Sequence, residues 1–208
     1  MSNKVKEYYG KILKKSSDLK TNACCTNIKY PEYILNSLKK IHDNIINSYY
    51  GCGLVIPDCL KNKKIMDLGC GTGRDVYLLS QFVGENGFIT GIDMTDEQLD
   101  KANNYIEYHT NVNNYVRPNV EFKKGYIEKL DELNLEKNSY DIIVSNCVVN
   151  LSPNKESVFK QVYNMLKNGG EFYFSDVYSS KRIPKDLQND DILWGECLSG
   201  ALYSNDFL

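Results

Sequence analysis

The stretch Lys64-Ile65-Met66-Asp67-Leu68-Gly69-Cys70-Gly71-Thr72-Gly73 decides the fold of this chain. An apolar segment, predicted to be a strand, runs into Asp67 and then into glycines at positions 69, 71 and 73. Glycine has no Cβ atom, so the backbone there can turn tightly and approach a ligand closely. Twenty residues after Gly73, a second apolar segment ends at Asp93. This pairing predicts a nucleotide-shaped ligand across the ends of two neighbouring parallel strands, with Asp93 accepting hydrogen bonds from both ribose hydroxyls.

The spacing of the glycines narrows the choice of ligand. The dinucleotide fingerprint is Gly-x-Gly-x-x-Gly, whereas this sequence has Gly-x-Gly-x-Gly followed by Arg74. The sequence also has no Gly-x-x-x-x-Gly-Lys-Ser/Thr phosphate loop. An acidic residue and alternate glycines after a first strand resemble the first motif of S-adenosylmethionine-dependent methyltransferases. That cofactor carries an ammonium and a sulfonium but no phosphate, so an acidic loop suits it. The alternative is a glycine-rich turn that binds no ligand.

The length and composition exclude several classes of protein. The 208 residues suffice for one domain with its own core, and the net charge of −2 comes from interspersed charges of both signs. No basic stripe is available for a phosphate backbone, so no nucleic-acid partner is predicted. No apolar run reaches the roughly 18 residues of a membrane span, and the polar amino terminus does not resemble a signal peptide, so we expect a cytoplasmic protein without a membrane partner. Seven cysteines in such a reducing compartment exceed what disulfide scaffolding explains.

Strand and helix patterns alternate along most of the chain. Helical spacing of apolar residues predicts helices over 3–15 and 31–48, the second with a stripe of Leu35, Leu38, Ile41, Ile45 and Ile46. Predicted strands are 63–68, 87–93, 119–124, 140–146 and 170–177. A helix at about 73–83 follows the first strand. The second strand is followed by a helix that a capping box opens at Thr95, and the fourth by a helix that begins at Ser152 and ends at Gly169 and Gly170.

This alternation predicts an α/β, Rossmann-like class I methyltransferase fold: a doubly wound, mainly parallel sheet with helices on both faces. We expect an amino-terminal helical extension over residues 1–60 and a cofactor-binding core over 61–180. Residues 181–208 would begin a metalloid-binding region that continues beyond this chain. The predicted sheet lacks the last strands of such folds and would leave its fifth strand as an exposed edge. We therefore expect this piece to be less stable and less active than a longer chain.

Further cofactor contacts are expected where strands end, at the switch point of the sheet. Gly125, Tyr126 and Ile127 follow the third strand and should lie against the adenine, although core packing explains Tyr126 and Ile127 equally well. Asn146 and Cys147 follow the fourth strand and should lie beside the reacting methyl group. Enzymes that methylate amide or base nitrogens often carry two prolines directly after this position, whereas the run here is Asn146-Cys147-Val148-Val149. A nitrogen is therefore a weaker candidate for the methyl acceptor, and the residue beside the methyl group is a thiol instead.

Four of the cysteines, at positions 24, 52, 147 and 197, stand in loops or helix ends between small residues. With the segments around them, the chain resembles the arsenite methyltransferases, over essentially its whole length. The glycine loop alone specifies only the superfamily, and the cysteine segments are specific to the family. The matching runs are Val5-Lys6-Glu7-Tyr8-Tyr9-Gly10, Leu19-Lys20-Thr21-Asn22-Ala23-Cys24, Tyr49-Tyr50-Gly51-Cys52-Gly53-Leu54, Asp67 to Gly73, Gly91-Ile92-Asp93-Met94, Gly125-Tyr126-Ile127-Glu128-Lys129-Leu130, Ser145-Asn146-Cys147-Val148-Val149-Asn150-Leu151, Phe174-Ser175-Asp176-Val177-Tyr178 and Trp194-Gly195-Glu196-Cys197.

The resemblance implies that S-adenosylmethionine methylates arsenite and then methylarsenite, the two substrates. Cys147 and Cys197 would hold the metalloid, Cys52 would be a third ligand, and Cys24 would pair with Cys52 in disulfide exchange that thioredoxin or glutathione reverses. The split between ligand and reductant roles stays open. The cofactor-binding residues implied are Asp67, Gly69, Gly71, Gly73, Asp93, Met94, Tyr126, Ile127 and Asn146.

The chemistry of arsenic agrees with this assignment. Trivalent arsenic is soft and prefers thiolates, as soft metal ions do. Its lone pair can attack a sulfonium methyl held at near-attack distance, where effective molarities are large. No general base is required, which fits the absence of a convincing His/Asp pair, since His42 and His109 look like surface helix residues.

Three alternatives remain at the level of sequence. A zinc site is disfavoured because Cys52 and Cys59 are seven residues apart and no Cys-x-x-Cys pair exists. A methyltransferase for another small molecule would use its cysteines only for packing. A fragment that binds trivalent arsenic without catalysis is the third.

Overall fold

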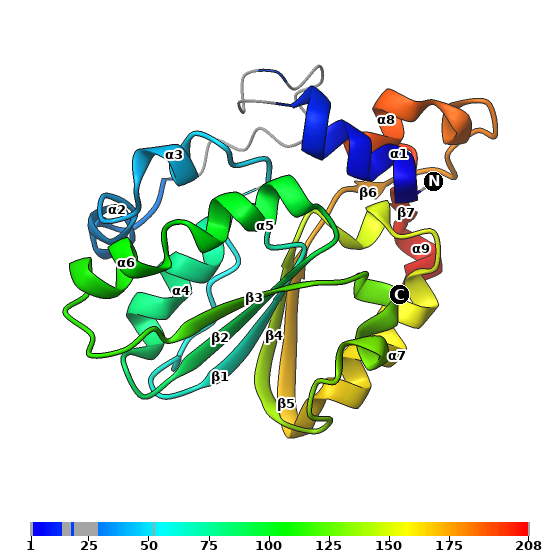
Figure 1. Cartoon of the computed structure of the whole chain (residues 1–208). Helices are drawn as coiled ribbons and strands as arrows, with labels where there is room; N and C mark the ends of the chain where they lie inside the picture. The colour runs from blue at the N-terminus through cyan, green and yellow to red at the C-terminus, as the bar shows by residue number, and fades with distance from the viewer. Residues whose placement is uncertain (1, 14–17, 19–28, 52, 208) are drawn as a thin grey trace.

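The computed structural model describes residues 2–13, 18, 29–51 and 53–207. At its centre lies a five-stranded sheet in the order β3-β2-β1-β4-β5, in which every neighbouring pair is parallel (Figure 1). The strands are β1 (Lys64–Leu68), β2 (Phe88–Asp93), β3 (Val120–Lys124), β4 (Tyr140–Asn146) and β5 (Leu166–Ser175). The predicted α/β, Rossmann-like fold is confirmed.

Helices cover both faces of the sheet (Figure 1). One face carries α4 (Arg74–Val83), α5 (Asp96–Asn103) and α6 (Ile106–Val112), and the other carries the 3₁₀ segments η3 (Ile127–Leu133) and η4 (Val149–Leu151) with α7 (Lys155–Met165). Side chains alternate between the two cores along a strand, as the pleat requires. In β1, Ile65 belongs to the core under α4 and Met66 to the core under α7.

The strand order creates a switch point between β1 and β4. The chain proceeds from β1 to β2 and β3 on one side, and returns to add β4 and β5 on the other. Leu68 pairs with both Ile92 and Ser145, so the carboxyl ends of the three central strands lie together. Ligands bind at such a point in open α/β sheets.

The amino-terminal part differs from its prediction. The structure has α1 (Ser2–Glu7) followed by a π-helical turn, η1 (Tyr8–Ile12), and two short helices, α2 (Glu32–Leu38) and α3 (Asp43–Ile46), in place of one helix over 31–48. The helix breaks before His42, whose ring nitrogen caps α3 by accepting from the Asn44 amide at 3.1 Å. Ile34 is buried and Leu38 packs against the core, so Leu35, predicted to be inside, is 43% exposed.

The helix after β2 begins where it was predicted, because Thr95 is the N-cap residue of α5, but the predicted start of the helix after β4 was wrong. The Thr95 hydroxyl bonds to Asp93 and makes no capping hydrogen bond to α5, so the predicted capping box is absent. Asn154, not Ser152, caps α7 by accepting from the Ser157 amide at 3.0 Å. Helix α7 then ends at Met165 and β5 begins at once, because Leu166 already pairs with Tyr140.

The prediction that His109 is a surface residue was also wrong. It is buried, and its ring stacks on Tyr77 with 3.6 Å between ring centroids. Burial lowers the pKa of His109 to about 4, so the ring is neutral near pH 7. It is a core residue rather than a surface one.

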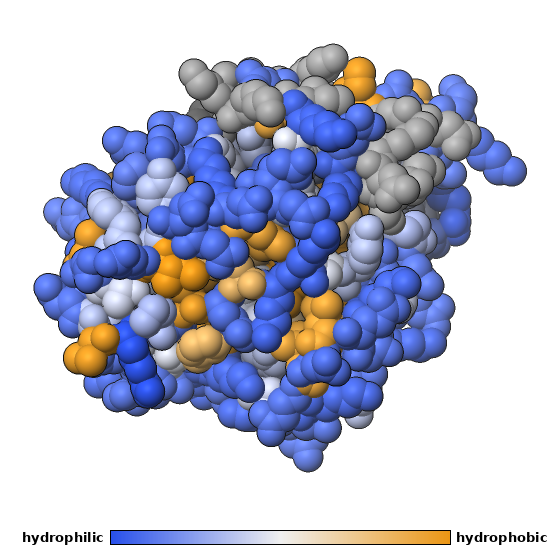
Figure 2. All heavy atoms as spheres, viewed as in Figure 1, coloured by the Kyte–Doolittle hydropathy of each residue, from blue (hydrophilic) through white to orange (hydrophobic). Residues whose placement is uncertain are grey.

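The segment after β5 contains β6 (Tyr178–Ser179), η5 (Leu187–Asn189), α8 (Asp191–Gly195), β7 (Leu202–Tyr203) and α9 (Ser204–Phe207). Strands β6 and β7 form a small parallel pair, and α8 lies beside α1 (Figure 1). The face in Figure 2 is predominantly hydrophilic, with apolar side chains showing through in the middle. None of the helices in the described part of the chain is long and apolar enough to cross a membrane.

Candidate functional site

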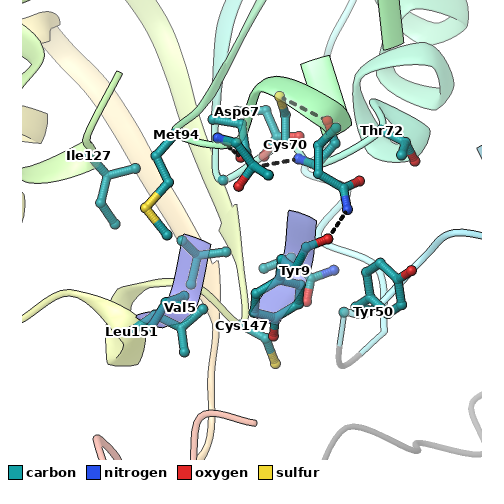
Figure 3. A pocket seen from close by; sticks show the side chains of 18 of the residues that line it. Val5, Tyr9, Tyr50, Asp67, Cys70, Thr72, Met94, Ile127, Cys147 and Leu151 are labelled. Carbon is teal, nitrogen blue, oxygen red and sulfur yellow. Dashed lines mark hydrogen bonds between the residues drawn. The ribbon is translucent and has the colours of Figure 1, made fainter. Parts of the chain in front are cut away.

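A cavity opens at the switch point, above the carboxyl ends of β1, β2 and β4. Its empty space is about 1000 Å³, including the part open to solvent. Nine of the residues predicted to hold cofactor or substrate line it, several of them labelled in Figure 3: Asp67, Gly69, Gly71, Asp93, Met94, Tyr126, Ile127, Asn146 and Cys147.

Asp93 ties the glycine loop to the end of β2. Its Oδ2 accepts from the Gly71 amide at 2.9 Å, and its Oδ1 accepts from the Thr95 amide at 2.8 Å. A carboxylate has about four lone-pair sites, so acceptor capacity remains for a ligand's hydroxyls. Burial raises the pKa of Asp93, while these hydrogen bonds lower it. The carboxylate is thus held in one orientation at the cavity wall.

Asp67 is the most unfavourably placed charge in the cavity. Its side chain is 3% exposed, and no hydrogen bond to it comes from the described residues. Burial raises its pKa well above the usual range, and the carboxylates of Asp75 and Asp93 raise it further. A cation bound here would relieve both effects, whereas a phosphate would add to the repulsion.

Two of the glycines permit close packing rather than ligand contact alone. Gly69 has a φ of +74°, and a Cβ there would lie 2.4 Å from the Val148 side chain, so the loop after β4 can approach the glycine loop. Gly73 is not on the cavity wall. It begins α4, where a Cβ would lie 2.7 Å from the Phe122 ring.

Asn146 holds a neighbouring loop in place. Its Nδ2, which has two hydrogens to donate, lies within hydrogen-bond distance of three acceptors: the Tyr49 hydroxyl at 2.6 Å, the Gly53 carbonyl at 2.9 Å and Asp75 at 3.1 Å. The Tyr49 hydroxyl also donates to the Gly53 carbonyl. Arg74 completes the cluster, since it pairs with Asp75 at 2.7 Å and its guanidinium lies 3.1 Å from the centre of the Tyr49 ring. The amide of Asn146 therefore fastens the Tyr49–Gly53 loop beside the cavity, a role that the sequence did not reveal.

Cys147 and Cys197 lie together although 50 residues separate them. The thiol of Cys197 donates to the carbonyl of Cys147 at 3.0 Å, and the two side chains are 4% and 1% exposed. Both residues adopt left-handed backbone conformations, with φ of 56° and 66°. Such conformations cost non-glycine residues free energy and gather at functional sites.

The two cysteines differ in their relation to the cavity. Cys147 is among the residues that line it and Cys197 is not, although both belong to one cluster against which Leu151 and Val177 pack. Cys147 is disulfide-bonded in this structure. Cys197 carries a thiol that is not part of a disulfide.

The other two predicted thiols, Cys24 and Cys52, fall outside the described residues. Within the ranges that the structure describes, no group of three or more His, Cys, Asp or Glu side chains could hold a metal ion.

The amino-terminal helices contribute cavity residues that sequence reasoning missed. Val5 and Tyr9 line the cavity from the side opposite the glycine loop (Figure 3). Gln98 Nε2 donates to the Tyr9 carbonyl at 2.9 Å, while its own Oε1 is buried without a partner at the cavity wall. In the sequence, Val5 and Tyr9 belong to a run, Val5 to Gly10, that matches the family, but no role in the site was predicted for that run.

The methyltransferase domain family matches residues 60–208. The chain belongs to this family. It is 55% identical over 203 residues to the arsenite methyltransferase of Rattus norvegicus. This match covers 97% of the present chain and 55% of the rat protein. The human arsenite methyltransferase is 51% identical, over 96% of this chain and 53% of the relative. The chain thus spans about half the length of the curated relatives it matches.

A solved structure gives the same result. CrArsM, an arsenic(III) S-adenosylmethionine methyltransferase from Chlamydomonas reinhardtii, superposes with a TM-score of 0.82 at 41% identity. The match covers 86% of this chain and 60% of that one. The resemblance predicted from the cysteine segments is therefore confirmed.

Proposed function

We propose that this chain transfers methyl groups from S-adenosylmethionine to trivalent arsenic held by thiolates, with arsenite and methylarsenite as successive substrates. One observation carries the proposal: two cysteines from distant parts of the chain lie in contact, and one of them lines a cavity with buried carboxylates in its wall. Arsenic is inferred as the methyl acceptor from the relatives, which are arsenite methyltransferases. The position of the two cysteines supports a binding place for arsenic beside the cavity.

The cavity residues fit this cofactor. The buried carboxylate of Asp67 suits the ammonium of the methionine portion, and Asp93 suits the ribose hydroxyls. Tyr126 and Ile127 would flank the adenine, with Met94 beside them and Gly69 and Gly71 giving backbone access. Asn146 would position the loop before Cys147. Three carboxylates around one apolar cavity disfavour any phosphate-bearing cofactor.

The thiolates of Cys147, Cys197 and Cys52 would bind arsenic as a pyramid that leaves its lone pair free. When bound, S-adenosylmethionine supplies an electrophilic methyl carbon. The thiolates would aim the arsenic lone pair at that carbon, so that an As–C bond would form as the S–C bond breaks, its electrons would stay on sulfur, and S-adenosylhomocysteine would be the product. The protein's task is to hold the two reactants at attack distance, and no proton has to be removed.

Methylation formally oxidises arsenic to the pentavalent state, so two electrons must be returned. A dithiol that closes to a disulfide supplies them, and we assign this to Cys24 with Cys52, reopened by thioredoxin or glutathione. Because Cys147 is disulfide-bonded here, reduction must also precede arsenite binding at that residue.

The test replaces each predicted ligand by serine. Cys147→Ser and Cys197→Ser should each lower arsenite methylation by more than about 100-fold, while S-adenosylhomocysteine binding stays within about twofold. Cys59→Ser is the matched control, because Cys59 is an exposed free thiol. Products are separated by chromatography and identified by mass spectrometry.

Two results would contradict the proposal. Methylation that survives in both variants would rule out the thiolate mechanism. Arsenic that binds the unmodified chain without ever yielding a methylated product would show a binding protein instead of an enzyme.

A further inference from the structure

The amino-terminal strap, defined as Ser2–Ile12, contacts two parts of the molecule that lie far apart in the sequence. It comprises α1 and η1. In Figure 1, α1 passes above the cofactor end of the sheet and lies beside α8. The strap therefore touches both the cavity and the segment that carries Cys197.

On the cavity side, the strap is held by α5. Val5 and Tyr9 line the cavity, and Gln98 Nε2 donates to the Tyr9 carbonyl at 2.9 Å. Lys6 adds a surface pair with Asp96, with 3.0 Å between Nζ and Oδ2. Since α5 begins three residues after Asp93, a ligand held by Asp93 lies under a strap anchored to the same helix.

On the other side, the strap is held by α8 and the residue after it. The Tyr8 hydroxyl donates to Glu196 Oε1 at 2.8 Å, and the Tyr9 hydroxyl donates to the Gly195 carbonyl at 2.7 Å. The Tyr8 ring packs on Gly195, where a Cβ would lie 2.9 Å away. Tyr8 and Glu196 are 7% and 1% exposed. A carboxylate buried to this degree depends on its hydrogen-bond donors, so the contact fixes the docking of the strap.

Glu196 directly precedes Cys197, whose own geometry is fixed. The Cys197 amide donates to the Trp194 carbonyl at 3.1 Å, and the Cys197 thiol reaches the Cys147 carbonyl at 3.0 Å. A shift of Glu196 would therefore move the Cys197 sulfur relative to Cys147. Cys147 lines the cavity and Cys197 does not, so cofactor binding acts on Cys197 through the residues that touch its segment, which include Cys147 itself and, by way of Glu196, the strap.

We propose that Tyr8 and Glu196 are positioning residues whose hydrogen bond transmits cofactor binding to Cys197. A ligand in the cavity contacts Val5 and Tyr9 when the strap is docked, so it favours the docked state over an undocked one. The docked strap in turn holds Cys197 beside Cys147. Cofactor and arsenite then raise each other's affinity by the same factor, as linkage requires. This inference rests on the proposed function, because it takes Cys147 and Cys197 as the arsenite ligands.

The experiment measures arsenite binding to the full chain, reduced with a phosphine, with and without saturating S-adenosylhomocysteine. Trp194 is the single tryptophan and lies three residues before Cys197, so its fluorescence reports binding. In the unmodified chain, S-adenosylhomocysteine should tighten arsenite binding by about fivefold or more. Tyr8→Phe, which removes one hydroxyl, and Glu196→Met, which removes the acceptor, should reduce that ratio to about one.

Two variants serve as controls. Glu196→Gln keeps an acceptor oxygen for Tyr8 and should retain the ratio, and Tyr163→Phe changes a tyrosine that is 80% exposed. A loss of packing alone would affect Glu196→Gln and Glu196→Met alike, so the contrast between them isolates the hydrogen bond. If circular dichroism shows that Tyr8→Phe does not fold, the inference is tested by comparing Glu196→Gln with Glu196→Met.

The outcomes separate this inference from the proposed function. A ratio of one in the unmodified chain, or an unchanged ratio in Tyr8→Phe or Glu196→Met, overturns the inference while thiol-dependent arsenite binding stands. Arsenite binding that is insensitive to both Cys147→Ser and Cys197→Ser overturns the proposed function, and the inference with it.

Discussion

Asp67 shows at the scale of one residue how a binding site and a stable fold impose opposite demands. Its carboxylate is buried beside two others, so burial and like charge both raise its pKa. Between its ordinary and its raised pKa, the folded protein binds more protons than the unfolded chain. The free energy of unfolding therefore falls as pH rises through that window. At neutral pH this carboxylate destabilises the fold that holds it.

Asp67→Asn is accordingly expected to stabilise the protein and to weaken cofactor binding. The free energy of unfolding should rise by about 1 kcal/mol, or about 2–4 °C in melting temperature for a chain of this size. Affinity for S-adenosylhomocysteine, whose ammonium loses its partner, should fall at least tenfold. Calorimetry of both quantities checks the prediction, with the exposed Asp58 changed to asparagine as control. A lower melting temperature for Asp67→Asn would show that the carboxylate supports the fold.

The same raised pKa predicts how cofactor binding depends on pH. An ammonium is held by the carboxylate form of Asp67, so affinity for S-adenosylhomocysteine should fall as pH decreases through the raised pKa. Titration calorimetry from pH 8 downward measures it. In Asp67→Asn the affinity should be weak and nearly independent of pH. An equal pH dependence in the variant would assign the titration to another group, such as Asp93.

Asn146 belongs to the scale of elements, because its amide joins the end of β4 to the Tyr49–Gly53 loop. Asn146→Ala removes the contacts of Nδ2 with Tyr49, Gly53 and Asp75, while the Gly53 carbonyl keeps the hydrogen bonds from Tyr49 and Arg74. We expect a loss of about 1–3 kcal/mol in the free energy of unfolding. Amide hydrogen exchange should accelerate in residues 49–53 more than in the sheet. The exposed Asn164 changed to alanine is the control, and unchanged exchange in the loop would contradict the clamp.

The elements also show what the sequence could predict. The ends of β1 and β2 were predictable, because Asp67 and Asp93 each belong to one short strand-loop segment and parallel register brings them together. The break at His42 was not, since it depends on a side chain that caps the next helix. The strap over the cavity was also missed, because Tyr8 and Glu196 meet across 188 positions that no local pattern connects. The proximity of Cys147 to Cys197 was accessible only through family resemblance.

At the scale of the whole molecule, the wall of the cavity is built from segments that lie far apart in the sequence. Its wall takes Val5 from the strap, Asp67 and Asp93 from the central strands, and Pro153 from the segment before α7. The strap extends this connection to α8 through Glu196. A ligand that binds only the folded state should therefore stabilise the strap, the sheet and the carboxyl-terminal segment as one unit.

We predict that S-adenosylhomocysteine raises the melting temperature of the chain in a single transition. At 100 times its Kd, a ligand adds about 2.7 kcal/mol to the free energy of unfolding, which corresponds to about 5–10 °C for a protein of 150–250 residues. Scanning calorimetry measures the shift, and near-ultraviolet signal from Trp194 reports whether the α8 segment melts with the sheet. Asp67→Asn, with an affinity at least tenfold weaker, should show at most about half of the shift at the same ligand concentration. Two transitions, of which only one moves with ligand, would mean that the segment around Cys197 is not coupled to the cavity, because a cooperative unit must melt at one temperature for every probe.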